Sequence, residues 1–458
     1  MSSLPSGNRD SFSSKFGVIA AAAGSAVGLG NIWRFPLVTT QNGGGAFLLL
    51  YIGFILFIGI PVMLSEFTIG RRAQLNAFGS FKKIAPGTPW YLVGFLGILT
   101  AFAILAFYST VAGWTLEYLV QAISGKLLHT QDMEKNFADF STHPYRPLIW
   151  QLVFMLLTAV VVYAGIQKGI EKFTKILMPI LLVLIIFVVV RAISLPGAGE
   201  GVKYLFVPDW SAVNFKTVLM ALGQAAFSLS IGMGTLITYG SYIQKDNNLL
   251  KTSAQVAFAD TSIAILSSLM VIPAIFAFSV GSIDQMSPGP GLVFEVLPNV
   301  FKSMPGGVIF SIIFFFLLSV AALTSTISVL EVVVAYLKEE LQFSRGKATL
   351  IGSVSISVLG VLATLSFGPL ADFQLFGQTI FGVLNYASAN IMLTFGALLI
   401  VVFVGWRMGR TAFMEEISNK GQLVSVMFKI VFFIIRYIAP IAIGIIAVAA
   451  LFMEGITG

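Results

Sequence analysis

The feature that most constrains this chain is a run of small residues in the middle of its first long apolar segment. Residues 24–31 read Gly-Ser-Ala-Val-Gly-Leu-Gly-Asn and lie inside the apolar segment from about residue 16 to residue 40. An unpaired backbone N–H or C=O in hydrocarbon is costly, so a helix break there must face protein, water, an ion or a substrate. A second interruption, Ser-Ile-Gly-Met-Gly, follows at residues 230–234. Two glycine-broken helices, one in each half of a chain with many spans, are typical of the binding site of a transporter.

The composition places the chain in a lipid bilayer. Of its 458 residues 57% are hydrophobic and 10% are charged, whereas soluble domains carry about 25% charged residues. The absence of cysteine excludes disulfides and thiolate catalysis. The two histidines, His129 and His143, lie in a polar stretch, so no histidine metal cluster is expected. The net charge of +7 comes from basic residues between apolar segments, which favours positive-inside topology over nucleic-acid binding.

A helix that crosses the hydrocarbon core needs about 20 apolar residues. The sequence therefore predicts an all-α integral membrane protein with eleven transmembrane helices, at about 16–40, 46–70, 89–124, 147–165, 172–194, 215–242, 253–281, 306–338, 348–367, 375–405 and 424–453. Lysine and arginine are concentrated in alternate connections, which predicts an N-terminus inside and a C-terminus outside. We expect a cytoplasmic tail over residues 1–15, a transporter core over 16–405, and an eleventh helix with a short external end over 424–458.

The two broken helices each open a set of five predicted spans, at about 16–194 and 215–405. An odd number of spans per set inserts the two sets in opposite orientations. The pattern therefore predicts a 5+5 inverted repeat with discontinuous helices 1 and 6, and a binding site near the middle of the bilayer.

Three separated motifs carry a family resemblance. Residues 24–31 continue into Ile-Trp-Arg-Phe-Pro at 32–36 and Gln-Asn-Gly-Gly-Gly-Ala-Phe at 41–47. The sixth span contains Gly-Gln at 223–224 and Phe-Ser-Leu-Ser-Ile-Gly-Met-Gly at 227–234, and the eighth contains Leu-Thr-Ser-Thr at 323–326. Over residues 9–405 the chain resembles the neurotransmitter:sodium symporter family, specifically its bacterial amino-acid transporters. The resemblance implies sodium-driven uptake of an amino acid by alternating access, in the cytoplasmic membrane of a bacterium.

The resemblance implies two Na⁺ sites. The first is expected to use Ala26, Asn31, Ser228, Asp260 and the carboxylate of the substrate, and the second Gly24, Val27, Ala321, Thr324 and Ser325. Oxygen ligands of this kind suit a hard cation, and carbonyls freed by a helix break provide them. For the hydroxyls of Thr324 and Ser325 a second interpretation stays open, because such groups commonly bond back to the preceding helical turn.

Asp260 is the most informative single residue. A lone carboxylate in an apolar span is expensive and usually functional. Many relatives have Asn at this position, and animal relatives bind chloride nearby, so a carboxylate here could ligate Na⁺ and replace that anion. We therefore expect chloride-independent transport. Two alternatives are an interfacial acid that faces the cytoplasm and a proton-coupled transporter that uses Asp260.

The resemblance also places the substrate. Amine transporters of the family have Asp where this chain has Gly28, so the substrate must bring its own carboxylate. Tyr108 is expected to donate its hydroxyl to that carboxylate, although ordinary aromatic packing would also explain a tyrosine here. The expected substrate residues are Ser25, Ala26, Gly28, Gly30, Ile104, Tyr108, Phe227, Ser230, Met233, Ser325 and Val329. The side-chain pocket carries no charge, and Met233 replaces a Phe of the leucine transporter, which predicts an apolar or aromatic substrate such as Leu, Met, Phe, Tyr or Trp.

Further residues are expected to gate or support this site. Arg34 would close it from outside together with Tyr108 and Phe227, and Gln224 would steady Arg34. Asn385 stands where relatives have an acid that pairs with this arginine. Arg9, Glu339 and Tyr242 would close it from inside. Glu66 is expected to bind freed amides of the broken helices. In bacterial relatives the spacing of Gly169 and Pro179 marks a segment of the fifth span that can unwind, although a helix start and a packed kink would explain the same residues.

Other classes of function fit less well. A channel would need a continuous polar pore, but charges within the predicted spans are few. An enzyme would need catalytic groups, and the spans lack histidine, cysteine and paired carboxylates. An amino-acid receptor of the same fold that does not transport stays open. We expect a zwitterionic amino acid and the lipid bilayer as partners and no nucleic acid, whereas the oligomeric state is left open.

Overall fold

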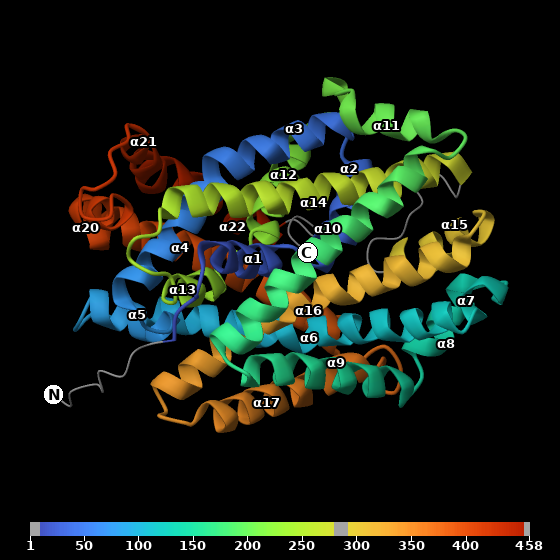
Figure 1. Cartoon of the computed structure of the whole chain (residues 1–458), viewed down its shortest axis with the longest axis horizontal. Helices are drawn as coiled ribbons and strands as arrows, with labels where there is room; N and C mark the ends of the chain where they lie inside the picture. Colours follow the sequence, from blue (N-terminus) through green and yellow to red (C-terminus); the bar gives the residue numbers. More distant parts are fainter. Residues whose placement is uncertain (1–9, 279–291, 453–458) are drawn as a thin grey trace.

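The computed structural model describes residues 10–278 and 292–452. Long helices run side by side and surround two short ones, α1 and α13 (Figure 1). The helices that build the bundle are α1 Lys15–Ala26, α2 Phe35–Gln41, α3 Gly45–Phe54, α4 Ile60–Ala73, α6 Tyr91–Ile123, α9 Arg146–Tyr163, α10 Lys172–Ile193, α12 Phe215–Ser228, α13 Thr235–Gly240, α14 Leu249–Phe278, α16 Gly307–Glu339, α17 Arg345–Leu365, α18 Ile380–Asn385, α19 Leu393–Val402, α21 Met427–Phe433 and α22 Ala439–Phe452.

Short helices cover the two ends of the bundle, with α5 and α20 at one end and α7, α8 and α15 at the other (Figure 1). They are α5 Ala77–Ile84, α7 Lys126–His129, α8 Met133–Ser141, α11 Ala198–Phe206, α15 Leu297–Ser303 and α20 Gly409–Ile417. A 3₁₀ turn, η4 Trp210–Ala212, precedes α12, and an antiparallel pair, β1 Gln374–Leu375 and β2 Gln378–Thr379, precedes α18. Several of the short helices are amphipathic in sequence, which suits a membrane–water boundary.

Within the described residues, seven π-helical segments join or extend the bundle helices. They are η1 Gly30–Arg34, η2 Ile55–Gly59, η3 Ile166–Glu171, η6 Leu292–Val296, η7 Tyr386–Met392, η8 Phe403–Met408 and η9 Ile434–Ile438. Segments of this kind are rare and occur frequently at functional sites. One of them, η1, continues the first span directly after its break.

The described residues contain nine helices long and apolar enough to cross a membrane, or ten if α1 and the η1–α2 segment form one span bent by 58°. The second expected broken span consists of α12 and α13, which are 14 and 6 residues long. Each is shorter than a bilayer-spanning helix, because the chain leaves helical geometry between them. The expected break in the first helix is therefore present. The described residues reach the expected total of eleven spans only if α1 with η1–α2 counts as one span and α12 with α13 counts as another.

Close backbone contacts hold the short helices in the centre. A Cβ atom on Gly70 of α4 would lie 1.9 Å from the carbonyl oxygen of Ile237 in α13, so only glycine allows these two helices to approach so closely. α1 packs against α10, α14 and α16. The broken helices are thus enclosed by protein, which is the condition for irregular backbone at membrane depth.

Candidate functional site

The two helix breaks meet inside the bundle. The first lies between Ala26, the last residue of α1, and Gly30, the first of η1, and the second lies between α12 and α13. Ser230 in the second break has a φ of 54°, a conformation that non-glycine residues seldom adopt. Its hydroxyl donates a hydrogen bond of 3.0 Å to the carbonyl oxygen of Ser25. This hydrogen bond joins the two breaks and stabilises the strained backbone conformation of Ser230. Strained residues of this kind cluster at functional sites.

Glu66 supports the second break. Its side chain is fully buried in α4, and its Oε1 accepts a hydrogen bond of 2.7 Å from the backbone N–H of Gly232. That N–H is one of the donors that the break leaves without a helical partner. Its other carboxyl oxygen, Oε2, has no hydrogen-bond partner among the described residues. Glu66 thus occupies the supporting position that the sequence predicts for it.

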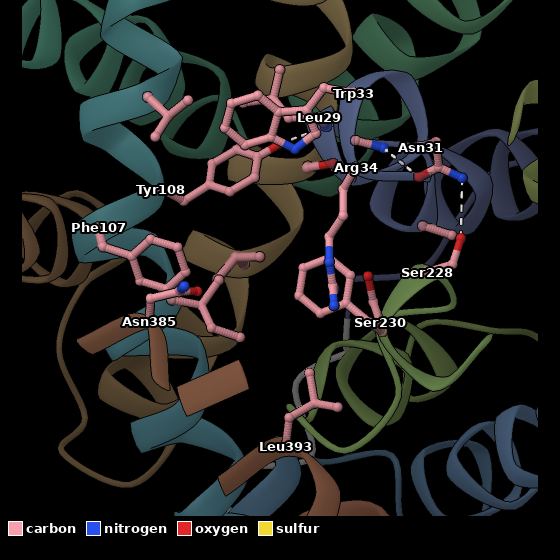
Figure 2. A pocket seen from close by; sticks show the side chains of 18 of the residues that line it. Leu29, Asn31, Trp33, Arg34, Phe107, Tyr108, Ser228, Ser230, Asn385 and Leu393 are labelled. Atoms are coloured by element: carbon pink, nitrogen blue, oxygen red, sulfur yellow. Dashed lines mark hydrogen bonds between the residues drawn. The ribbon is translucent and has the colours of Figure 1, made fainter. Parts of the chain in front are cut away.

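A cavity of about 290 Å³ opens beside the breaks (Figure 2). All the residues expected to bind substrate line it, together with Asn31, Ser228, Arg34 and Asn385. Some of its hydroxyl and amide groups, those of Ser25, Asn31, Ser228, Ser230 and Ser325, come from the breaks and the helices beside them. Apolar side chains, among them those of Ile104, Phe227, Met233 and Val329, form much of the remaining wall. The cavity therefore combines polar groups at the breaks with a largely apolar wall, the arrangement typical of small-molecule sites.

Tyr108 points its hydroxyl at the first break. The hydroxyl oxygen accepts a hydrogen bond of 3.0 Å from the backbone N–H of Leu29 (Figure 2). Its proton is therefore available to a ligand in the cavity. A Cβ atom on Gly28 would lie 2.7 Å from Ser325 Oγ and 3.0 Å from the same Tyr108 hydroxyl. Position 28 thus has no room for a side chain in this structure. The Tyr108 hydroxyl also bonds the backbone of the first break, so this tyrosine has a polar role besides aromatic packing.

The first oxygen cluster surrounds Asp260, which is fully buried in α14. Asp260 Oδ1 lies 2.7 Å from Asn31 Nδ2, and Oδ2 lies 2.7 Å from Ser228 Oγ. Among the described residues no lysine or arginine pairs with this carboxylate. The structure therefore excludes an acid that faces the aqueous boundary, and it brings together three of the four residues expected at the first Na⁺ site, while Ala26 lies beside them on the cavity wall.

Tyr51 is a member of this cluster that sequence reasoning missed. Its buried hydroxyl lies 3.2 Å from Asp260 Oδ2 and 3.2 Å from Ser228 Oγ. The sequence does show a tyrosine hydroxyl within the apolar run at 46–70. Aromatic residues are common in such runs, however, so this tyrosine alone did not indicate a polar site. Tyr51 fixes the orientation of the carboxylate from the side of α3.

The second oxygen cluster joins α1 to α16. Ser325 Oγ lies 3.1 Å from the carbonyl oxygen of Val27 and 3.4 Å from those of Gly24 and Ser25. Thr324 lies beside Gly24, because a Cβ atom on Gly24 would be 3.2 Å from Thr324 Cβ. The Thr324 hydroxyl bonds back to the carbonyl oxygen of Ala321 at 3.0 Å. The five residues expected at the second Na⁺ site thus lie together. The Thr324 hydroxyl also bonds to the preceding helical turn, as the alternative interpretation of this residue expects.

Ser328, one helical turn after Ser325, was not expected at the site. Its hydroxyl lies 2.9 Å from the hydroxyl of Ser25. Ser328 thus adds a contact between side chains to the bonds that Ser325 makes with backbone carbonyl oxygens of the first span. The pattern of hydroxyls at 324–328 was visible in sequence, but which of them face α1 depends on the helix rotation.

Arg34 and Asn385, which are expected at the outer gate, both line the cavity (Figure 2). The guanidinium carbon of Arg34 lies 4.7 Å from the ring centroid of Phe227, a cation–π contact. Its Nη1 has no hydrogen-bond partner among the described residues, and neither amide atom of Gln224 has one. The predicted support of Arg34 by Gln224 is therefore wrong in this structure, because their polar groups form no hydrogen bond.

At the inner end, Arg9 lies outside the described residues, so its contact with Glu339 is untested. Glu339 accepts hydrogen bonds from the backbone N–H of Asn76 at 2.7 Å and from its side-chain amide at 3.0 Å. Tyr242 donates a hydrogen bond of 2.7 Å to Glu331, which pairs with Arg345 at 2.6 Å. Glu331 and Arg345 are partners that sequence reasoning missed, and they connect the C-terminal part of α16 and the N-terminus of α17 to the chain after α13.

Gly169 and Pro179 lie at the start of the fifth span, in η3 and α10. A Cβ atom on Gly169 would be 2.1 Å from the carbonyl oxygen of Val161, so this glycine is required for the contact with α9. The neighbouring Glu171 accepts hydrogen bonds of 2.7 Å from both the backbone N–H and the hydroxyl of Ser13. The start of the fifth span is thus wound in this structure and tied to the chain before α1.

The chain is similar to known membrane transport proteins. Residues 9–143 and 133–455 match the sodium:neurotransmitter symporter family. The chain is 39% identical over 437 residues to the uncharacterized sodium-dependent transporter YhdH of Bacillus subtilis, covering 95% of this chain and 96% of that protein. It is 29% identical to the sodium-dependent serotonin transporter of Drosophila melanogaster, covering 94% and 75%. The crystal structure of MhsT in complex with L-phenylalanine matches with a TM-score of 0.89 and 45% identity, covering 97% of this chain and 100% of that chain.

Proposed function

Because the chain belongs to the sodium:neurotransmitter symporter family, we propose that this sodium-dependent transporter takes up a zwitterionic amino acid with an apolar or aromatic side chain. The observation that carries the proposal is the meeting of two helix breaks beside one cavity, with an oxygen cluster on each side. Freed carbonyls and hydroxyls attract Na⁺, and a bound Na⁺ attracts the carboxylate of the substrate. Binding of the ion and of the amino acid is thereby coupled.

The chemistry of the cavity supports the choice of substrate. Tyr108 offers a hydroxyl proton to a carboxylate, and the carbonyl oxygens of the breaks suit an ammonium group. Ile104, Phe227, Met233 and Val329 surround the remaining space with apolar and aromatic surface. The structural relative MhsT has been crystallised in complex with L-phenylalanine, which agrees with an aromatic or branched side chain in this compartment.

Two Na⁺ per substrate are proposed because two separate oxygen clusters flank the breaks. Moving one charge through 100 mV is worth about 2.3 kcal/mol, and a tenfold concentration ratio adds about 1.4 kcal/mol. Two ions would then supply roughly 7 kcal/mol, enough for roughly a 10⁵-fold ratio of a zwitterion, whereas one ion would support only a few hundredfold. The stoichiometry therefore limits how far the substrate can be concentrated.

Transport is proposed to be independent of chloride. The carboxylate of Asp260 lies in the first oxygen cluster and has no cationic side chain beside it within the described chain. A bound Na⁺ would neutralise it, so no separate anion is required to balance the ion. We further propose location in a bacterial cytoplasmic membrane with eleven spans, an inverted repeat, the N-terminus inside and the C-terminus outside.

Thermal unfolding of the purified protein with each of the twenty common amino acids tests this function, because a bound ligand raises Tm by mass action. Three buffers separate the ions: sodium chloride, sodium gluconate and choline chloride. We expect leucine, methionine or aromatic amino acids to raise Tm equally in both sodium buffers and not in choline. A rise that needs no Na⁺, or that is as large for lysine or glutamate, would overturn the proposal.

A further inference from the structure

Arg436 is a cation placed deep in the last described span. It lies in η9, within the apolar helix Met427–Leu451. Nine residues separate it from Met427, which corresponds to about 13 Å along a helix axis. Half of the hydrocarbon core of a bilayer is about 15 Å thick. A cation at such depth is costly unless its head reaches the boundary or finds a partner.

Two aromatic rings and one glycine shape the surroundings of Arg436. Its guanidinium carbon lies 5.5 Å from the ring centroid of Tyr437 and 5.9 Å from that of Trp406 in η8. Those two rings contact each other edge to face and are half exposed on the outer surface of the bundle. The stem of Arg436 lies against Gly405, where a Cβ atom would come within 3.1 Å of Arg436 Cα. The head is thus held between rings that face lipid.

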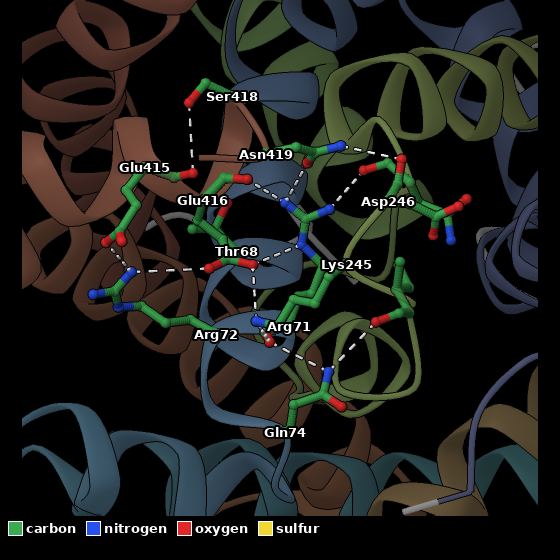
Figure 3. A network of polar contacts seen from close by, with 12 residues as sticks. Thr68, Arg71, Arg72, Gln74, Lys245, Asp246, Glu415, Glu416, Ser418 and Asn419 are labelled. Carbon is green, nitrogen blue, oxygen red and sulfur yellow. Dashed lines mark hydrogen bonds and ion pairs between the residues drawn. The ribbon is translucent and has the colours of Figure 1, made fainter. Parts of the chain in front are cut away.

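α20, which packs against α21, holds carboxylates, but other cations already pair with them. Glu416 of α20 lies 2.7 Å from Arg71 and 3.2 Å from Lys245, and Figure 3 shows these side chains together. Glu415 pairs with Arg72 at 3.0 Å. In the described part of the chain Arg436 forms no ion pair, and its buried Nε has no hydrogen-bond partner. Within residues 10–278 and 292–452, therefore, no carboxylate neutralises Arg436.

Two further basic residues lie close to this position in sequence and fold. Arg407 directly follows Trp406 in η8, and Lys429 lies in α21, seven positions before Arg436. Both are exposed and form no ion pair within the described residues. The same flank therefore presents several cations beside aromatic rings, at the end of the molecule where α20 and α21 lie (Figure 1).

We propose that this flank binds the phosphate headgroup of an anionic phospholipid, with Arg436 as its principal ligand. A guanidinium matches phosphate oxygens with two parallel N–H donors. The long side chain of arginine can extend from the helix toward the headgroup level. Arg407 and Lys429 add positive charge there, while Trp406 and Tyr437 contact the upper acyl chain, as aromatic residues do at membrane boundaries. The site is separate from the cavity at the helix breaks.

Native mass spectrometry of the full chain with added phosphatidylglycerol or phosphatidylcholine tests this site. We expect the protein to retain phosphatidylglycerol preferentially, and Arg436→Gln to lower that retention at least tenfold. Arg436→Lys keeps the charge but not the paired donors, so we expect an intermediate loss. Arg191→Gln is the matched control, because Arg191 also lies over a ring, that of Phe310, at 5.9 Å and in another helix; it should retain the lipid.

A second variant, at Trp406, tests the same site if Arg436→Gln folds poorly. Trp406→Leu leaves every charge in place and should weaken retention of phosphatidylglycerol several-fold. Equal retention of the two lipids by the parent protein would overturn the proposal, as would unchanged preference in both variants. Loss of a protein dimer on mutation of Arg436, with no change in bound lipid, would assign the flank to a second copy of the chain instead. Sodium-dependent ligand binding should persist in Arg436→Gln.

Discussion

Asp260 Oδ1 and Asn31 Nδ2 lie 2.7 Å apart at the edge of the first helix break. The amide nitrogen of Asn31 donates to the carboxylate, while its oxygen accepts from the backbone N–H of Gly28 at 3.3 Å. A sodium ion is coordinated by oxygen, not by an N–H group. Binding at this cluster therefore requires the Asn31 amide to turn its oxygen toward the ion, which links ion binding to the geometry of the break at Gly28.

Replacing the carboxylate tests that relationship. Asp260→Asn removes the negative charge that balances Na⁺ in a buried site, so we expect the Na⁺ concentration for half-maximal substrate binding to rise at least tenfold. Titration of ligand binding with NaCl at constant ionic strength measures this. Glu117→Gln is the control, since Glu117 is also buried but pairs with Arg146 away from the breaks. If both variants lost Na⁺ dependence, the cause would be general damage to the fold. If Asp260→Asn left the half-maximal Na⁺ concentration unchanged, Asp260 would not belong to the Na⁺ site.

The second oxygen cluster predicts a change in ion stoichiometry. Thr324→Val preserves the shape of the side chain beside Gly24 but removes its hydroxyl. We expect the cooperativity of Na⁺ activation to fall from that of two ions toward that of one, because the first cluster is untouched. Thr158→Val provides a comparison, since Thr158 is a buried threonine bonded to Thr326 at 2.8 Å. Unaltered cooperativity in Thr324→Val would contradict a Na⁺ site there.

Position 28 is predicted to tolerate no side chain. In Gly28→Ala the new methyl group would meet Ser325 Oγ at 2.7 Å and the Tyr108 hydroxyl at 3.0 Å. Overpacking of this kind costs about 1–3 kcal/mol, so we expect a lower Tm and substrate binding weakened at least tenfold. Gly53→Ala is the control because a Cβ atom there meets no neighbour, and it should be neutral or slightly stabilising. Normal substrate affinity in Gly28→Ala would show that the cavity has more room.

The outer end of the cavity predicts a gain of function. Asn385→Asp would introduce a carboxylate into the cavity that Arg34 also lines, where the charge pair is shielded from bulk water. We expect slower dissociation of bound substrate, by several-fold, in a filter-binding chase. The double variant Arg34→Gln/Asn385→Asp should lose this effect, because the pair is then incomplete. Equal dissociation rates in the parent and Asn385→Asp would mean that the two side chains do not meet when the cavity closes.

Several parts of the site could be predicted because they depend on local chemistry. The small residues at 24–31 and 230–234 disfavour a continuous helix, and the structure breaks both segments. Asp260 was identified because an isolated carboxylate in an apolar run requires a partner. These inferences follow from the cost of unpaired polar groups in hydrocarbon and need no knowledge of distant contacts.

Other parts depend on how helices are rotated against each other, which apolar sequence leaves undetermined. Tyr51, Ser328 and Glu331 reach the site or its inner end only through the packing of α3 and α16. The absent bond between Gln224 and Arg34 has the same cause, since their adjacency was inferred from resemblance. The π-helical segments range from the apolar Ile-Leu-Phe-Ile-Gly of η2 to the polar Ile-Gln-Lys-Gly-Ile-Glu of η3, so composition did not predict them.

Uptake of labelled substrate into proteoliposomes under an imposed Na⁺ gradient tests the central claim most directly. An amino acid identified by the binding panel should accumulate above its external concentration when Na⁺ is higher outside. Accumulation should collapse when the gradient is dissipated by a sodium ionophore, and it should be unchanged when gluconate replaces chloride. Accumulation that persists without a Na⁺ gradient, or binding that never leads to uptake, would contradict the account.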